Sequence, residues 1–319
     1  MSRFQCYGVI NRTDMLTTFI KYWLATSYQS QGQWKKAEPL FLESVRYQEE
    51  QNTQTEYLYT GLGFLPYVQG CVLVGYNLAV QGRTNEAKEL FQKSYMPVVR
   101  EASNLYTKTG CAVWHSRFSA LIGEDCGAAA RADEALEITK ESDSPVFRLR
   151  SFDAKGKVLM ALGQYESARM IFEQALEAIG GKTYRVGLAG VYFDLVQVNL
   201  ELGDQTEAKR YYQTALPLIK SNPDRIAPRF DFLKGRLLAS ADPPNFKQSK
   251  SFFERSIHAE EEANAVVLAA QTRFYLAQVL AQEGEVDRSR NLLEQIYCQF
   301  QNWEISVWQK KCEEALKTI

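Results

Sequence analysis

A few side chains in this 319-residue sequence could do chemistry, and their spacing decides whether they do. Gly181-Lys182-Thr183 resembles the end of a phosphate-binding loop, but Leu176 stands where the first glycine of GxxxxGK[ST] belongs. The tripeptide also follows a predicted helix, whereas a phosphate-binding loop follows a strand and presents its backbone N–H groups to the phosphate. We therefore expect an ordinary turn between helices at this position.

The acids and histidines do not form a catalytic pattern either. Glu260, Glu261 and Glu262 are consecutive, and consecutive helical residues point in different directions, so paired carboxylates are not expected. His115 and His258 have no acid at a spacing that would make either a catalytic base. The sequence predicts a protein that is not an enzyme. The alternative is an enzyme that uses His115 or a cysteine in a pocket between helices.

The cysteines show no metal-binding spacing. No CxxC pair occurs, and two histidines are too few to complete a zinc set with cysteines so far apart. We expect reduced, mostly buried cysteines, no metal site and no cofactor. The six cysteines are Cys6, Cys71, Cys111, Cys126, Cys298 and Cys312.

The segment 152–175 shows which elements organise the chain. Small and large residues alternate in it as they do where two antiparallel helices meet at a tight turn. Small side chains allow close approach of the backbones and large ones fill the space between them. Such a pair must stack on copies of itself to bury its apolar face. The positions are Gly156, Leu159, Gly163, Tyr165, Ala168, Phe172 and Ala175.

Seven copies of this unit can be aligned, and the pattern resembles the tetratricopeptide repeat. Gly82, Gly123, Gly163 and Gly203 occupy the turn position at intervals of 41, 40 and 40 residues. The usual period is about 34 residues, so each helix is expected to be longer than usual. Segment 54–66 is the one irregular connection, either reaching over the inner groove or merely a tolerated insertion. The alanine-rich stretch 128–135 in the third copy predicts either a hinge or closer packing.

The sequence therefore predicts an all-α, right-handed superhelical solenoid. Residues 1–12 are expected to form a lead-in, 13–301 the tetratricopeptide-like repeats, and 302–319 a capping helix. Asn302 is the predicted N-cap of that helix, with Ile305, Trp308 and Cys312 on its buried face. A chain that begins almost on a repeat suggests a module of something larger.

A narrower resemblance rests on the long period and on two stretches. These are Gly63-Phe-Leu-Pro-Tyr67 and the segment from Ser289 to Phe300, SRNLLEQIYCQF, followed by Trp303. They resemble the C-terminal repeat region of STAND-type signalling ATPases, which in bacteria are often joined to class III nucleotide cyclase or DNA-binding domains. The resemblance implies a sensing or regulatory role, with a neighbouring ATPase or cyclase domain as one partner. This chain has no recognisable nucleotide-binding, cyclase or DNA-binding part.

Register predicts which side chains of the first helix of each pair line the concave groove. Five are basic against one acid, Asp153, which favours a ligand with carboxylate or phosphate groups, and the aromatic residues add contact area. The alternative is that half or more of these residues are ordinary solvated or core-edge positions. The predicted groove consists of Tyr22, Tyr76, Arg117, Arg150, Lys157, Phe193, Gln197, Arg229, Arg236 and Phe274.

Composition narrows the function further. The formal net charge is −1, from 37 Lys and Arg against 38 Asp and Glu, so direct nucleic-acid binding is not expected. No segment reads as a signal peptide or a membrane span, which predicts a cytoplasmic protein without membrane contact. The predicted function is a non-catalytic scaffold or regulatory module that binds a protein or peptide segment, with an acidic one favoured. The alternative is the small-ligand sensor domain of a signalling ATPase, cyclase or transcription regulator.

Overall fold

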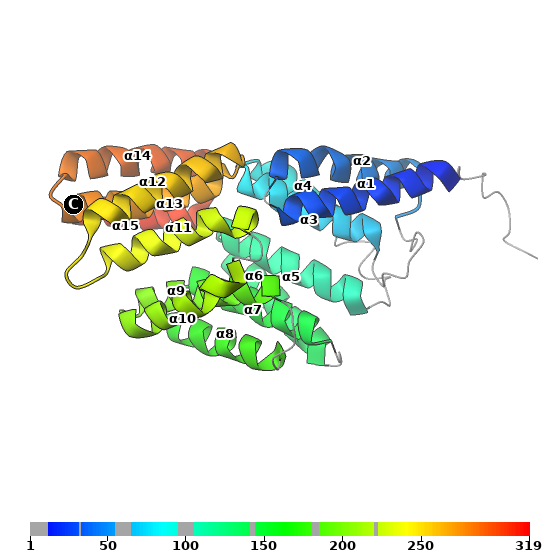
Figure 1. Ribbon diagram of the computed structural model, residues 1–319. Helices are drawn as coiled ribbons and strands as arrows, with labels where there is room; N and C mark the ends of the chain where they lie inside the picture. The colour runs from blue at the N-terminus through cyan, green and yellow to red at the C-terminus, as the bar shows by residue number, and fades with distance from the viewer. Residues whose placement is uncertain are drawn as a thin grey trace, which may run out of the picture.

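The computed structural model describes residues 12–31, 33–54, 65–94, 105–140, 144–179, 185–219 and 223–319. Over these ranges the chain forms helices and short turns, with no β-strand, as the sequence predicted (Figure 1). The helices are α1 (Arg12–Ser30), α2 (Trp34–Glu50), α3 (Pro66–Val80), α4 (Thr84–Ser94), α5 (Leu105–Ile122), α6 (Asp125–Lys140), α7 (Pro145–Ala161), α8 (Tyr165–Ile179), α9 (Arg185–Glu201), α10 (Gln205–Ile219), α11 (Pro223–Ala239), α12 (Phe246–Glu262), α13 (Val266–Gln282), α14 (Val286–Asn302) and α15 (Ser306–Thr318).

The turn glycines have the conformation that their spacing predicted. Within the described residues, the five glycines that join the two helices of a pair have positive φ, in the left-handed region where a side chain is strained and glycine is favoured. Their φ angles are 77° at Gly82, 89° at Gly123, 73° at Gly163, 77° at Gly203 and 87° at Gly284. The repeat boundaries therefore follow from local backbone chemistry.

Within a pair, a small residue on one helix leaves space for an aromatic ring of the other helix, as the pattern of segment 152–175 predicted. Gly156 of α7 faces Phe172 of α8 so closely that a Cβ at position 156 would overlap the ring. The same arrangement recurs in the sixth pair, where a Cβ at Gly235 would lie 2.9 Å from Phe253. Phe172 and Phe253 are at most 1% exposed, so these crossings are the centres of their repeats.

The two helices of each pair play different parts. The second helices bury one stripe, such as Ser289, Leu293, Ile296 and Phe300 on α14, and expose the rest. The first helices are buried around more of their circumference, since each also contacts the repeats before and after it, and α3 and α13 show this most clearly. In Figure 1, α8 and α10 form the lower outer layer and α2 and α14 the upper one, with α7, α9, α3 and α13 between these layers.

The alanine-rich third repeat is closely packed. Ala128, Ala132 and Ala135 of α6 are at most 1% exposed, and they pack against small and β-branched residues of α5 and α7 such as Ala120 and Val158. Small side chains at buried positions let helices approach one another, which is the second of the two alternatives predicted from the sequence.

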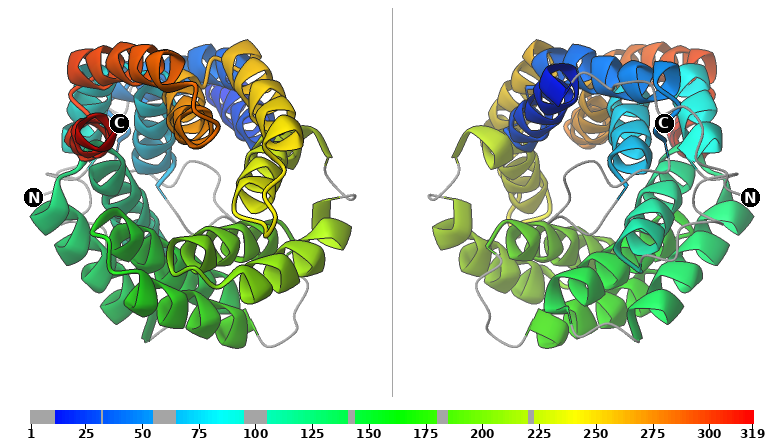
Figure 2. Two further views of the ribbon diagram at one scale, coloured as in Figure 1. Left: turned by 90° about the vertical axis from the view of Figure 1, so that its left-hand side faces the viewer. Right: turned by 90° about the vertical axis from the view of Figure 1, so that its right-hand side faces the viewer.

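The superhelix closes on itself after one turn. Figure 2 shows the helices arranged in a ring in which the C-terminal repeat comes to lie beside the second and third repeats. Three hydrogen bonds join these distant segments: Thr84 Oγ1 donates to the Trp303 carbonyl (2.5 Å), Asn264 Nδ2 to Gln81 Oε1 (2.7 Å) and Ser306 Oγ to the Ile122 carbonyl (3.1 Å). We call these six residues, with the ion pair of Lys88 and Glu304 (2.8 Å), the clasp.

Beside the clasp, the first and last described repeats share one hydrophobic core. Buried residues of α1–α5 and of α13–α15 form one continuous cluster, and Trp303 packs so closely on the turn at Gly82 that no Cβ would fit there. Cys312 of α15 is fully buried in this cluster, with Trp308 half-buried beside it, as their shared helical face predicted. The C-terminal helix therefore packs against α5 as well as against its own repeat.

The prediction that Asn302 caps the last helix is wrong. Asn302 is the final residue of α14, and the chain turns at Glu304, which has a φ of 55°. The Ile305 N–H donates to the Phe300 carbonyl (2.9 Å) and the Glu304 N–H to the Gln301 carbonyl (3.1 Å). This pair of bonds is a Schellman motif, which ends a helix through backbone geometry and does not require glycine. Asparagine is a common N-cap residue, which led to the prediction, but α14 continues through Asn302 to the Schellman motif.

None of the described helices combines the length and the apolar character that a bilayer span requires.

Substitution of Gly156 by Ala tests the close crossing of α7 and α8. We expect Gly156→Ala to lower the free energy of unfolding by about 1–3 kcal/mol, because the added methyl group overpacks a core position against Phe172. Gly190→Ala in α9 is the matched control: among the described residues, no atom outside the adjacent backbone of α9 lies within 4 Å of its added Cβ, so a gain of up to about 1 kcal/mol is expected from helix propensity. Urea unfolding of both variants measures the difference. Equal effects would contradict the packing argument.

The clasp predicts a coupling between the second and seventh repeats. Thr84→Val keeps the shape of a side chain that is 2% exposed but leaves the Trp303 carbonyl without this donor. We expect a loss of about 1–2 kcal/mol and faster amide hydrogen exchange in α15. Thr214→Val, on an exposed face of α10, removes a hydroxyl that bonds within its own helix and should leave α15 unchanged. Unaltered α15 exchange in Thr84→Val would show that the clasp does not hold α15.

Candidate functional site

The two histidines considered from the sequence lie in different surroundings, His115 packed inside the fold and His258 on the surface. His115 lies against Phe91, with ring centroids 4.8 Å apart, and its Nε2 is 3.1 Å from Ser94 Oγ. Burial lowers the pKa of His115 to about 4, so the ring is neutral at pH 7. His258 is exposed on α12 and faces Glu262 at 3.4 Å. Over the described residues, no three His, Cys, Asp or Glu side chains are close enough together to hold a metal ion.

A ladder of ion pairs crosses three of the first helices. Arg117 of α5 pairs with Asp153 of α7, Lys157 of α7 bonds Asp153 at 2.6 Å, and Lys157 also pairs with Asp194 of α9. The Asp153 side chain is 6% exposed and that of Asp194 is 11% exposed, whereas Lys157 keeps 33% exposure. Gln197 Nε2 approaches Asp194 Oδ1 at 3.5 Å. We call these five residues the charge ladder.

The charge ladder separates the pKa values of its two acids. Burial opposes ionisation of Asp153, but Lys157 and Arg117 outweigh it and lower the pKa of Asp153 to about 2. At Asp194 burial prevails, and the negative charge of Asp153 adds to it, so the pKa of Asp194 rises to about 6 although Lys157 opposes the rise. The ladder is therefore held by Asp153, and Asp194 is its weaker end.

Aromatic rings flank the charge ladder. The Arg117 guanidinium lies 5.0 Å from the ring centroid of Trp114, which contacts Tyr76 of α3 at 5.1 Å between centroids. On the α9 side, the half-buried ring of Phe230 meets the buried ring of Phe193 edge to face at 5.7 Å. Flat apolar surface beside fixed charges is the combination that binds extended polar ligands.

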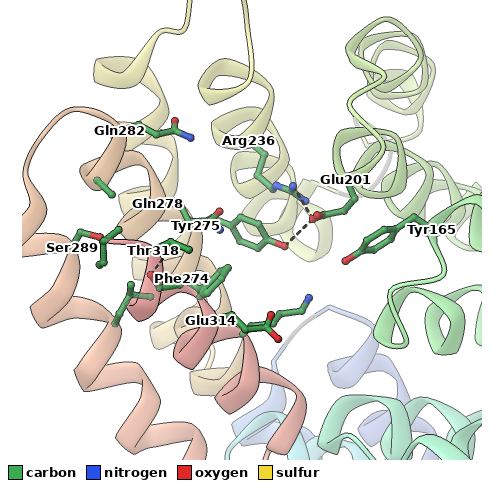
Figure 3. Close-up of a pocket in the computed structure, with 15 residues that line it drawn as sticks. Tyr165, Glu201, Arg236, Phe274, Tyr275, Gln278, Gln282, Ser289, Glu314 and Thr318 are labelled. Atoms are coloured by element: carbon green, nitrogen blue, oxygen red, sulfur yellow. Dashed lines mark hydrogen bonds and ion pairs between the residues drawn. The ribbon is translucent and has the colours of Figure 1, made fainter.

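A cavity of about 550 Å³ opens between α15 and the ends of α9 and α11 (Figure 3). Across it, Arg236 Nη2 bonds Glu201 Oε1 at 2.9 Å, and the Tyr275 hydroxyl donates to the same oxygen at 3.2 Å. The guanidinium also covers the Tyr275 ring, 4.2 Å from its centroid. The lining residues include Tyr165, Phe274, Gln278, Gln282, Lys311 and Glu314. A smaller cavity of about 170 Å³ shares Arg236, Tyr275, Gln278 and Gln282 with it.

A buried acid lies at the junction of α11, α12 and α13. Glu260 is 3% exposed and accepts a hydrogen bond from Thr272 Oγ1 at 2.9 Å. Burial raises the pKa of Glu260 to about 7, although Arg229, Thr272 and Ser256 oppose the rise. Of the three consecutive acids considered from the sequence, Glu260 is thus buried, whereas Glu261 and Glu262 are exposed.

The structure brings some of the predicted groove residues together. Arg117, Lys157 and Gln197, which are spaced by 40 residues, occupy equivalent positions of successive repeats and meet in the charge ladder. Arg236 and Phe274 both line the larger cavity. The excess of five bases over one acid suggested that the basic side chains are free. Three of them instead form ion pairs, with Asp153, Asp194 and Glu201.

Other predicted residues belong to the core or its edge. Tyr22 is 2% exposed and packs against Phe41, so it does not offer its ring to a ligand. Phe193 is 6% exposed and also belongs to a hydrophobic cluster. Register could not separate these from groove positions, because a first helix is buried on several sides. Arg150 and Arg229 are half-buried. Arg229 lies over the Phe232 ring at 4.7 Å.

Sequence reasoning missed several residues of the two sites. Asp194 lies three residues before Gln197 and Asp153 lies four residues before Lys157, so each acid comes about one helical turn before a predicted groove residue, which was a usable signal. Tyr165, Glu201 and Lys311 carried no such signal, because they come from helix ends or the last helix and meet through superhelical closure.

Three predicted features lie outside the described residues. They are residues 1–11 of the predicted lead-in, the Gly181-Lys182-Thr183 tripeptide and most of segment 54–66.

Comparison with known proteins agrees with this architecture. Residues 148–221 match the tetratricopeptide repeat family model. The matched segment covers nearly all of the helix pairs α7–α8 and α9–α10. No curated protein sequence matches it.

Solved structures share the fold at low sequence identity. A Rap protein complexed with competence and sporulation factor is 13% identical, with a TM-score of 0.65 over 93% of this chain and 80% of that one. Aspartyl phosphate phosphatase F from Bacillus subtilis is 14% identical, with a TM-score of 0.60 over 90% and 72%. A STAND protein with a tetratricopeptide repeat sensor, from Pyrococcus horikoshii, is 15% identical, with a TM-score of 0.51 over 94% and 44%. The tetratricopeptide-like solenoid thus extends over the chain, beyond the segment matched by the family model.

Glu260 predicts a stability that falls with pH. Its pKa is about 7 in the fold against 4.5 for an exposed glutamate, so its contribution is fully present below pH 4.5 and is lost as the pH rises through 7. We expect Glu260→Gln to be more stable than the parent by about 1–3 kcal/mol at pH 8 and to match it near pH 4.5. Thermal unfolding across pH 4.5–8 measures this. Glu262→Gln, at an exposed position, is the control, and an unchanged pH profile in Glu260→Gln would refute the assignment.

Proposed function

We propose that this tetratricopeptide-like protein is a non-catalytic scaffold or regulatory module that binds a protein or peptide segment along its first helices. The observation that carries the proposal is the charge ladder with its aromatic flanks, which continues across α5, α7 and α9. A peptide presents amides, charges and apolar side chains in alternation, and this surface matches each of them. The structural likeness to a Rap protein whose structure contains a factor bound to it supports the same conclusion.

A second candidate is a small-ligand sensor, and the 550 Å³ cavity favours it. That volume lies in the range of small-molecule sites, and its walls combine aromatic rings with a few placed polar groups. The structural likeness to a STAND protein with a repeat sensor agrees with this candidate. In either case a neighbouring ATPase or cyclase domain is a proposed partner in signalling.

Removal of one neutral pair from the charge ladder tests the first proposal. Lys157→Gln with Asp194→Asn deletes a cation and an acid together, so no uncompensated charge stays buried and the fold should persist. We expect affinity for the partner segment to fall by about tenfold or more. The partner is captured from a lysate of the source cells, mapped to a synthetic peptide, and its binding measured by fluorescence anisotropy.

Lys155→Gln with Asp133→Asn is the matched control. This pair, at 2.7 Å, joins α7 to α6 outside the charge ladder and also deletes one charge of each sign. Circular dichroism confirms folding of both variants. Equal peptide affinity in the two double variants would show that the charge ladder is not the binding surface.

A further inference from the structure

The larger cavity contains a cation without an acidic partner. Lys311 of α15 is half-buried and lies over the Trp308 ring, 4.5 Å from its centroid. Within the described part of the chain, its ammonium group makes no hydrogen bond or ion pair. Burial lowers the pKa of Lys311, Arg236 adds to this, and Glu201 and Glu314 oppose it without cancelling it.

The acids that line the cavity do not neutralise this cation. Glu201 Oε1 is already shared between the Arg236 guanidinium and the Tyr275 hydroxyl. Glu314 is exposed, so water screens its charge. Two partly buried cations, Arg236 and Lys311, therefore face one hydrogen-bonded acid, Glu201.

The remaining wall is mixed: Gln278, Gln282, Ser289 and Thr318 are polar, and the other lining residues are apolar or aromatic. Phe274, Ala281, Leu293 and Ala315 line it, and Tyr165 lies at the far side (Figure 3). A charged group that binds at Lys311 would thus be joined to an apolar portion in a space of about 550 Å³. That space suits a small organic molecule or a few residues of a peptide.

We infer that this cavity binds an organic anion, whose carboxylate or phosphate group lies at Lys311 and whose apolar part lies against the half-buried Ala315 and Ile319. The inference rests on the binding function proposed above and identifies a second site for it. The anion has two sources, a free organic acid or an acidic side chain of a bound peptide. The chemistry is the same for both, because a charge-assisted hydrogen bond to a partly dehydrated ammonium is stronger than one made in water.

Calorimetric titration of the full chain tests the inference with four probes: inorganic phosphate, phenylacetate, a blocked hexapeptide containing glutamate, and the same peptide with glutamine instead. We expect saturable binding of phenylacetate or of the glutamate peptide and weaker binding of the glutamine peptide. Tighter binding of phenylacetate indicates a free organic acid, and tighter binding of the glutamate peptide indicates a peptide side chain. Binding of phosphate alone, without the apolar part, would contradict the inference.

Variants at Lys311 test whether the bound probe contacts this side chain. Lys311→Met keeps an apolar stem over Trp308 and should weaken binding about tenfold or more, whereas Lys311→Arg keeps the charge and should bind within about threefold of the parent. Lys310→Met, at the exposed neighbouring position, is the control and should change nothing. In the parent, NMR of dimethylated lysines should show the pKa of Lys311 rising on binding, which a purely structural role would not produce.

The outcomes separate the two proposals. Equal binding by the parent and Lys311→Met, or no saturable binding of any probe, overturns the anion site. Neither result affects the charge ladder, whose function is decided independently by peptide capture with Lys157→Gln/Asp194→Asn.

Discussion

The close crossing of two antiparallel helices is the contact on which the rest of this structure depends. Where Gly156 faces Phe172, the absence of a side chain on one helix makes room for a ring on the other. Each pair has two apolar faces that would be exposed to water if it stood alone, so it is stable only when neighbouring pairs cover them. Repetition of this requirement makes a solenoid, and the nearly constant 40-residue period makes its curvature even.

Closure after one turn changes what such a solenoid can do. An open array exposes its groove along its length, but here Trp303 and Ser306 bind the turns of the second and third repeats. Residues from α8, α9, α11, α13, α14 and α15 consequently share one cavity. The clasp and the cavity wall both include the α14–α15 region, so the packing of the last helix links the stability of the ring to the shape of the site.

The inner charges obey a different constraint from the core. Taking Asp153 and Asp194 out of water is costly, and shared contacts with Arg117 and Lys157 offset that cost. Paired charges of this kind contribute little net stability but fix where polar groups lie. Because these charges are held in place without a ligand, little entropy would be lost in ordering them during the proposed binding.

The sequence alone determined the elements and their order. Positive-φ turns require glycine, and helix crossings require small residues opposite large ones, so both leave local marks that repeat with the period. Those marks located the helix pairs, the long period and the equivalent positions of Arg117, Lys157 and Gln197. The Asn302 cap was mispredicted because the Schellman turn at Glu304 depends on backbone geometry that no single residue type announces.

Tertiary structure decided which side chains are buried and which come together in the two sites. Tyr22 and Phe193 share the pattern of groove residues but are buried, because a first helix has several covered sides and periodicity does not tell them apart. Arg236 contacts Glu201, 35 residues before it in the chain, and Tyr275, 39 residues after it. Lys311 lies 75 residues beyond Arg236, in a different helix. Their meeting depends on the accumulated rotation of every repeat between them, a global quantity that local sequence patterns do not encode.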